Sequence, residues 1–201
     1  NALSKEGIGK GDRIALLTKH HVPCFLLFLG ALKVGAVCMP VNWRLAASEV
    51  EFIVYHGQAR LLLTDASFAA PFLRGGVAKL PAGCAVLCTE NPLDDVLAFE
   101  QWYSDQSSDF TAVQAQPDDS AVQIYSSGTT GLPKGVVLTH RGLLSTSRVV
   151  SDEWDFGADS TFGNALPAFH VAGITMLLLT LYTGGKSVVY SDFEPTTFIE
   201  G

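Results

Sequence analysis

The stretch Ala121-Val-Gln-Ile-Tyr-Ser-Ser-Gly-Thr-Thr-Gly-Leu-Pro-Lys-Gly-Val-Val-Leu-Thr139 carries most of the information on the fold. Residues 121–125 alternate partly between apolar and polar side chains, which predicts a β-strand. The β-branched run at 135–139 predicts a second strand. The ten residues from Ser126 to Gly135 hold three glycines and one proline, so they form a loop. We expect the two strands to carry this loop as a hairpin-like tongue.

The composition of the loop suits a polyphosphate ligand. Its glycines allow positive φ angles and a close approach of the backbone to a ligand, so that exposed N–H groups can form an anion-binding concavity. Four hydroxyl side chains, from two serines and two threonines, add donors, and Lys134 adds a positive charge. Composition alone leaves a second interpretation open, namely a Gly/Ser-rich hairpin that binds nothing.

Two other phosphate-binding motifs do not fit. A Walker P-loop has Gly-x-x-x-x-Gly-Lys-Ser/Thr and opens a helix. Here Lys134 is followed by Gly135 and then by a predicted strand, so both the spacing and the context differ. The dinucleotide-binding pattern Gly-x-Gly-x-x-Gly does not occur in this part of the chain either.

The remaining chain alternates between short apolar runs and helical patterns, which predicts an α/β fold with mainly parallel sheets flanked by helices. Ser48 and Glu51 form a capping-box pattern, which predicts the start of a helix that runs to about His56. The predicted strands are 13–17, 36–41, 60–64, 84–88, 121–125, 135–139, 161–166 and 187–190. The predicted helices are 24–34, 48–56, 140–154 and an apolar one between the last two strands.

Composition excludes several classes of protein. The chain has 201 residues, of which 48% are hydrophobic and 16% charged, with a net charge of −7 and no run of five like charges. A nucleic-acid-binding surface is therefore not expected. The apolar segment 22–41 is broken by a lysine, glycines and prolines, so it predicts a buried helix and strand and not a membrane span. The sequence leaves a homo-oligomer open.

Single residues carry further expectations. Cys24, Cys38, Cys84 and Cys88 stand in apolar surroundings and are expected to be buried free thiols, which suits a reducing compartment. No metal site is expected from them. Together with the lack of signal-peptide features, this predicts the cytoplasm. We expect three histidines at the surface or at helix ends, and the tryptophans in packing roles; these residues are His20, His21, His56, Trp43, Trp102 and Trp154.

The segment Tyr125–His140 closely resembles the phosphate-loop signature of the AMP-forming acyl-CoA synthetases, which belong to the adenylate-forming superfamily. Three upstream segments, 11–15, 30–37 and 40–45, resemble segments of the same family. Pro167–Gly173 resembles the aromatic-histidine segment of the family. The resemblance therefore covers nearly the whole chain and identifies it with part of the large N-terminal domain of such enzymes.

The resemblance implies a two-step reaction. A carboxylate attacks the α-phosphorus of ATP to give acyl-AMP and pyrophosphate, and a thiol, usually that of CoA, then takes the acyl group. In this family the loop holds the β- and γ-phosphates. The implied phosphate-binding residues are Ser126, Ser127, Gly128, Thr129, Thr130, Gly131, Leu132, Pro133, Lys134 and Gly135. The implied catalytic residues are Thr130, Lys134 and His170, and the implied cofactors are ATP, Mg²⁺ and CoA.

His170 alone, among apolar neighbours, has the pattern of a core histidine. The resemblance instead implies that it lies where the ATP and acid sites meet and helps to place the carboxylate. Phe169, His170, Val171 and Gly173 are then residues of the acyl pocket. The chain departs from the family at Ala168, where a larger apolar residue is usual, and this affects the expected shape of the pocket.

Other segments of the family do not occur among the 201 residues. We find no Tyr-Gly-x-Thr-Glu stretch, whose acidic residue would serve Mg²⁺, no Thr-Gly-Asp stretch for the ribose, and no C-terminal lid domain. We therefore expect a partial N-terminal domain, inactive alone, with an α/β portion at 1–100, a surface connection at 101–119 and the phosphate-loop and acyl-pocket portion at 120–201.

The expected substrate is a fatty or aryl acid. The alternatives are another adenylate-forming enzyme, such as a peptide-synthetase adenylation domain or a luciferase-like enzyme, and a non-catalytic remnant that binds nucleotide or only a partner protein.

Overall fold

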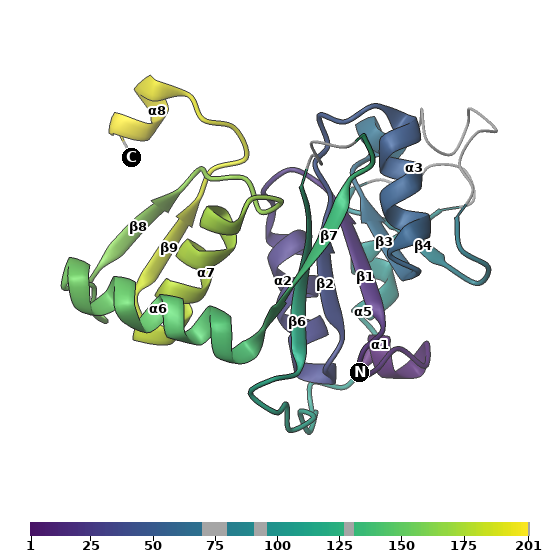
Figure 1. The fold of residues 1–201 in the computed structure, drawn as a ribbon, viewed down its shortest axis with the longest axis horizontal. Coiled ribbons are helices and arrows are strands. Elements are labelled where there is room, and N and C mark those ends of the chain that lie inside the picture. Colours follow the sequence, from purple (N-terminus) through teal and green to yellow (C-terminus); the bar gives the residue numbers. More distant parts are fainter. Residues whose placement is uncertain (70–79, 91–95, 127–130, 201) are drawn as a thin grey trace.

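A computed structural model describes residues 1–69, 80–90, 96–126 and 131–200 of the chain (Figure 1). The loop residues 127–130 therefore lie outside the described part. The described elements are α1 (Ala2–Lys5), β1 (Arg13–Leu17), α2 (Val22–Val34), β2 (Val37–Pro40), α3 (Ala47–His56), β3 (Ala59–Thr64), β4 (Ala85–Cys88), β5 (Leu97–Ala98), α5 (Phe99–Tyr103), β6 (Ser120–Ser126), β7 (Lys134–Thr139), α6 (His140–Trp154), β8 (Thr161–Asn164), α7 (Val171–Thr183), β9 (Lys186–Val189) and α8 (Pro195–Glu200).

Seven strands form one sheet in the order β5-β4-β3-β1-β2-β6-β7. All neighbours pair in parallel except β6 and β7, which pair antiparallel. The central strands are buried on both faces, which explains why β1 and β3 are nearly continuous apolar runs. The prediction of a mainly parallel sheet flanked by helices is confirmed.

Alternate residues of the central strands point into two separate cores. In β1, Ile14 and Leu16 join the core that contains α2, whereas Ala15 and Leu17 join the core that contains α3. The chain runs from β1 through α2 to β2 and through α3 to β3, and β2 and β3 lie on opposite sides of β1. Right-handed crossovers in opposite directions place the two helices on opposite faces of the sheet.

The C-terminal third forms a second layer beside this sheet. Strands β8 and β9 pair in parallel and lie next to α6 and α7, to one side of the seven-stranded sheet (Figure 1). Helix α7 joins the two parts, because its Ile174 and Leu177 are buried in the same core as α2. The two sheets are therefore held together by a shared apolar core.

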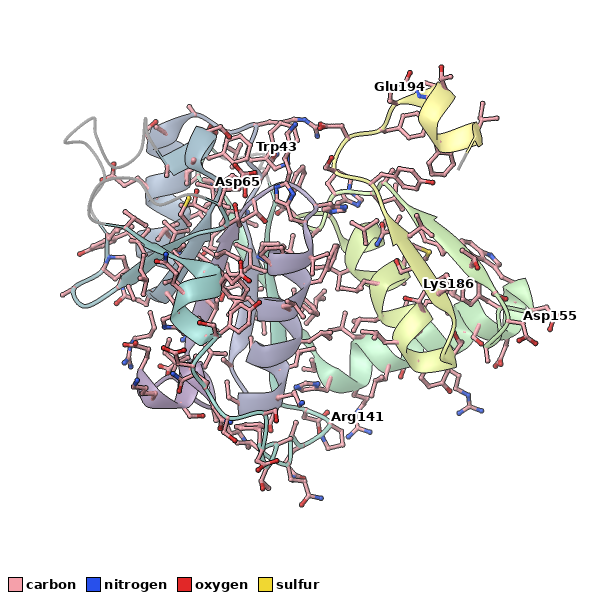
Figure 2. All side chains as sticks on the ribbon, turned by 180° about the vertical axis from the view of Figure 1, so that it is seen from behind. Trp43, Asp65, Arg141, Asp155, Lys186 and Glu194 are labelled. Carbon is pink, nitrogen blue, oxygen red and sulfur yellow. The ribbon has the colours of Figure 1, made fainter. Side chains whose placement is uncertain are left out.

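The carboxyl ends of the parallel strands of both sheets meet at one edge. Lys19, just after β1, forms an ion pair with Asp192, which follows β9, with an Nζ–Oδ1 distance of 2.7 Å. Trp43, after β2, contacts the ring of Phe169, which follows β8. Figure 2 shows Trp43 at this edge and Arg141 at the opposite edge of the large sheet. In open α/β sheets such carboxyl edges are the usual place for ligands.

Several local expectations are wrong. Helix α3 begins at Ala47 and not at Ser48, because the Glu49 carboxylate accepts a hydrogen bond from the Ala46 N–H at 2.9 Å. His20 is buried, with 7% of its surface exposed, whereas Trp154 is 59% exposed.

Other expectations hold in part. Helix α5 takes in residues 101–103 of the stretch 101–119, which is expected to be a surface connection. The strand expected to run to Leu166 ends at Asn164. All four cysteines are free thiols, and three of them are buried while Cys84 is partly exposed. In the described part of the chain, no helix has the length and apolar character that crossing a bilayer requires.

Candidate active site

The glycine-rich loop is carried by the antiparallel hairpin of β6 and β7, as predicted. Ser126 pairs with Lys134 and Tyr125 with Gly135 at the end of the ladder next to the loop. Beyond this pair, the predicted site residues Ser127, Gly128, Thr129 and Thr130 lie outside the described residues. Gly131 has a φ of 105°, a backbone conformation that residues other than glycine rarely adopt. The glycine at this position is thus required by the turn.

The described end of the loop faces solvent. Leu132 is 65% exposed, and Ser126, Gly131 and Lys134 are exposed as well, while Pro133 is half-buried. Within the described residues, the Lys134 ammonium has no ion-pair or hydrogen-bond partner. A lysine without a carboxylate partner, next to a glycine turn, can offer its charge to an anionic ligand.

A hydrogen-bond network that the sequence did not indicate lies near the loop end of this hairpin. The Tyr125 hydroxyl lies 2.7 Å from His56 Nδ1 at the end of α3, and it accepts a hydrogen bond from Gln123 Nε2 at 3.0 Å. Burial raises the pKa of the Tyr125 phenol, so the hydroxyl is neutral near pH 7. The one available signal was the position of Tyr125 directly before the loop.

Gly135 is confined by the same network. A Cβ atom at Gly135 would lie 2.5 Å from Gln123 Nε2 and 3.2 Å from the ring of Tyr125. The Tyr125 and Gln123 side chains therefore lie over the β7 backbone at this point, and a side chain at residue 135 would displace the Gln123 amide.

His170 is the N-cap residue of α7. Its Nδ1 accepts a hydrogen bond from the Ala172 N–H at 3.4 Å, and its side chain is exposed. When Nδ1 accepts, the proton of the neutral ring is on Nε2, which is then a donor available to a ligand. The position of His170 at a helix N-terminus also favours an anion beside it.

The residues around His170 form a tight turn into α7. Val171 is 46% exposed and Phe169 is half-buried, whereas Gly173 is buried. A Cβ atom at Gly173 would lie 2.3 Å from the Pro167 carbonyl oxygen, so the helix can approach this turn only because residue 173 is glycine. Of the predicted pocket residues, His170 and Val171 are exposed and Phe169 is half-buried, while Gly173 makes the close backbone contact beneath them.

The two predicted parts of the site do not contact each other through their described residues. Among residues 126 and 131–135 and residues 166–173, the structure shows no hydrogen bond, ion pair or ring contact from one group to the other. The contacts of Phe169 instead reach the segment after β2, through Trp43 and Arg44. In the described part of the chain, no three His, Cys, Asp or Glu side chains gather as a metal-binding set.

These elements define an α/β protein in which an antiparallel, glycine-rich hairpin extends a parallel sheet and a histidine caps the helix between the two strands of a second sheet. Residues 1–200 match the sequence profile of the family described as AMP-binding enzyme. The chain belongs to the AMP-binding enzyme family.

Two relatives of the chain are CoA ligases by name. The chain is 35% identical over 197 residues to a long-chain-fatty-acid–CoA ligase of Mycobacterium tuberculosis, which covers 98% of this chain and 38% of the relative. It is 37% identical over 150 residues to a 3-hydroxybenzoate–CoA/4-hydroxybenzoate–CoA ligase of Thauera aromatica, which covers 74% of this chain and 29% of the relative. The chain thus spans less than two fifths of the length of either relative.

A solved structure supports the fold. The ATP-bound MatB protein of Rhodopseudomonas palustris superposes with a TM-score of 0.85 at 27% sequence identity, over 100% of this chain and 39% of that protein. The architecture of the described residues is therefore that of part of the N-terminal domain of adenylate-forming enzymes.

Proposed function

We propose that the whole protein activates a carboxylic acid with ATP and transfers the acyl group to the thiol of CoA. In the first step a carboxylate oxygen bonds to the α-phosphorus of ATP, and the bond from that phosphorus to the bridging oxygen breaks, which releases pyrophosphate. In the second step the CoA sulfur bonds to the acyl carbon and AMP leaves. Membership of the AMP-binding enzyme family, with CoA ligases as relatives, supports this reaction.

The observation that carries the proposal is the β6–β7 hairpin. At the loop end of its ladder it presents a glycine with positive φ and Lys134, which has no ion-pair partner among the described residues. The loop from Ser126 to Gly135 would bind the β- and γ-phosphates, with Thr129 and Thr130 as hydroxyl donors. Lys134 would stabilise the charge that develops on the leaving pyrophosphate, which is a catalytic effect of positioning and electrostatics.

His170 would place the acid. Its Nε2–H is free to donate to a carboxylate oxygen, and Phe169, Val171 and Gly173 would form the adjoining wall of the acyl pocket. A fatty or aryl acid is the substrate class that we infer, because the wall is apolar and because the two relatives described above are named for a long-chain fatty acid and a hydroxybenzoate. We also infer that Mg²⁺ accompanies ATP, and that the protein works in the cytoplasm, as its free thiols favour.

The test is acid-dependent exchange of pyrophosphate into ATP by the whole protein, with a panel of fatty and aryl acids, followed by thioester formation with CoA. Lys134→Ala and Thr130→Ala should each lower the exchange rate by about 10²–10³, the usual loss for one transition-state donor. Lys186→Ala, an exposed lysine in β9, is the matched control and should exchange at the wild-type rate.

Two results would contradict the proposal. Exchange at the wild-type rate in both loop variants would remove the assigned role of the loop. Absence of exchange with every acid, together with no heat of ATP binding in calorimetry, would favour the non-catalytic alternative. We expect no exchange by residues 1–201 alone, because the acidic and ribose-binding segments of the family do not occur in them.

A further inference from the structure

Trp43 occupies the junction between the two sheets, at the edge where the carboxyl ends of their strands meet. Its ring stacks on Phe68, which follows β3, with a centroid distance of 5.6 Å and an interplanar angle of 14°. On its other side the Phe169 ring packs edge-on at 6.4 Å and 80°. Both are favourable aromatic geometries. Trp43 therefore contacts both Phe68, in the segment after β3, and Phe169, the residue directly before His170.

Two cations hold the indole from further directions. The Arg44 guanidinium lies 4.4 Å from the Trp43 ring centroid and 5.8 Å from that of Phe169. Lys19 Nζ lies 5.7 Å from the Trp43 ring. Cations at these distances from an indole attract its face. The ring thus contacts four side chains, and one of the four, Phe169, lies in the segment between β8 and α7.

Lys19 itself is anchored to both sheets. Its backbone N–H donates to Asp65 Oδ2 at 2.8 Å, and Asp65, which is 5% exposed, also accepts from Thr89 Oγ1 at 2.7 Å. Its ammonium group bonds to both carboxylate oxygens of Asp192, at 2.7 and 2.9 Å. A buried carboxylate that accepts several hydrogen bonds fixes a turn firmly. The Lys19 contact with Trp43 therefore starts from a fixed backbone.

The alternative is that Trp43 only fills space. An ordinary packing tryptophan would contact side chains of one core, as Trp102 does on the other face of the sheet, where it packs on Phe99. Trp43 instead lies between the rings of Phe68 and Phe169. Phe169 is half-buried, and the next residue is the exposed His170. A shift of Trp43 would thus be passed to Phe169 and to the turn that holds His170.

We propose that Trp43 is a positioning residue of the acid site, which sets the place of Phe169 and, through it, of His170. This inference rests on the proposed function. Because small displacements of reacting groups cost large factors in rate, loss of this contact should affect the acid more than the phosphates of ATP. Trp43 acts through Phe169 and needs no contact of its own with the reacting atoms.

The experiment is pyrophosphate exchange by Trp43 variants of the whole protein, with KM for the acid, KM for ATP and kcat determined separately. Trp43→Ala should raise the KM for the acid about tenfold and leave the KM for ATP within about twofold, a split that loss of folded protein cannot produce. Trp43→Phe keeps a ring between Phe68 and Phe169 and should restore the acid KM to within about threefold. An unchanged acid KM in Trp43→Ala would overturn the proposal.

Trp102→Ala is the matched control, because it removes the same side chain from a position outside the site. It should lower the melting temperature and leave both KM values unchanged, and an equal rise of the acid KM in Trp102→Ala and Trp43→Ala would contradict a role specific to Trp43. If Trp43→Ala does not fold, the variant Phe68→Leu tests the proposal instead, because it removes the stacking partner of Trp43 and leaves Phe169 unchanged. It should raise the acid KM about threefold, and no rise would overturn the proposal.

Fluorescence gives an independent readout. In a variant with Trp102→Phe and Trp154→Phe, Trp43 is the one tryptophan left among residues 1–201, and any tryptophan elsewhere in the whole protein is also replaced by phenylalanine. Its emission should change when the acid and ATP are added to the whole protein, whereas the variant that keeps only Trp102 should not respond. No change at Trp43, in a protein that shows acid-dependent exchange, would overturn the positioning role alone. Absence of exchange in the wild-type protein would instead overturn the proposed function.

Discussion

His20 is a buried histidine at the end of β1, where the two sheets meet. Burial is the main cause that lowers the pKa of His20 below its ordinary value of about 6.5; a hydrogen bond with the backbone of Asn164 raises it and the nearby His21 lowers it. The unfolded chain therefore binds a proton at His20 more readily than the folded chain. Stability is therefore lost as the pH falls from about 6.5 towards the lower folded value, and above about 6.5 the full stability is present and His20 adds no pH dependence.

The measurement is the free energy of unfolding in urea at pH 7.5 and pH 5.5. We expect His20→Gln to lose less stability between these two pH values than the wild-type chain, by about 1.4 kcal/mol for each unit of pKa displacement. Since the other four histidines are present in both proteins, the difference isolates His20. Equal losses in the two proteins would show that burial does not impede protonation of this ring.

Gly173 gives a second prediction for a single residue. Since a Cβ here would lie 2.3 Å from one backbone carbonyl oxygen and 2.6 Å from another, Gly173→Ala must displace the turn before α7. We expect a loss of about 1–3 kcal/mol in the free energy of unfolding, as for other overpacked sites. Gly9→Ala is the control, because no atom lies within 4 Å of its Cβ position. A Gly173→Ala variant as stable as Gly9→Ala would refute the close contact.

At the level of elements, β3 carries three consecutive leucines that are fully buried, Leu61, Leu62 and Leu63. Leu62 is fully buried and faces the core that contains α3, between the neighbouring strands β1 and β4. Leu62→Ala should cost about 2–5 kcal/mol in the free energy of unfolding, because the rigid strands on both sides limit collapse of the cavity. Leu144→Ala in α6, where the side chain is 50% exposed, should stay within about 0.5 kcal/mol of the wild type. Similar losses would contradict the assignment of β3 to the centre of the fold.

The elements themselves were largely predictable, since their signals are local. Apolar runs such as Leu61–Leu63 gave β3, and the glycines at 128, 131 and 135 gave the hairpin loop. The failures depend on distant residues: His20 is buried because Asn164 and Phe25 pack on it, and nothing near His20 in the sequence indicates this. The predicted helix start at Ser48 is one residue late. The Glu49 carboxylate accepts a hydrogen bond from the Ala46 N–H, and this contact places the helix start at Ala47.

The sequence names candidate site residues, but it does not show which residues support them. The loop motif and His170 could be named from sequence, because glycine, hydroxyl and lysine types reveal an anion site. The Tyr125–His56 bond and the Trp43–Phe169 contact join residues 69 and 126 positions apart, so only the folded chain shows them. The positions of the phosphate loop and of His170 as binding groups stay predictions.

At the level of the whole molecule, the two sheets differ in how well they are buried. Strands β1 and β3 lie inside a seven-stranded sheet with cores on both faces, whereas β8 and β9 form a pair whose residues are mostly exposed or half-buried. A two-stranded sheet has little stability of its own and depends on what packs on it, here helix α7, which in turn packs on α6. The part of the chain that carries His170 is thus joined to the weaker of the two sheets.

Native-state hydrogen exchange of residues 1–201 tests this difference. Amides of β1 and β3 should exchange only through global unfolding, whereas those of β8 and β9 should exchange through a partial opening of lower free energy, because fewer buried apolar contacts hold them. Lys19→Met, which removes the ion pair with Asp192 at the junction, should lower the opening free energy of β8 and β9 by less than about 1 kcal/mol, since Asp192 is 63% exposed, and leave β1 unchanged. Exchange of all four strands at one free energy, shifted together by the variant, would instead mean that the two sheets unfold as a single cooperative unit.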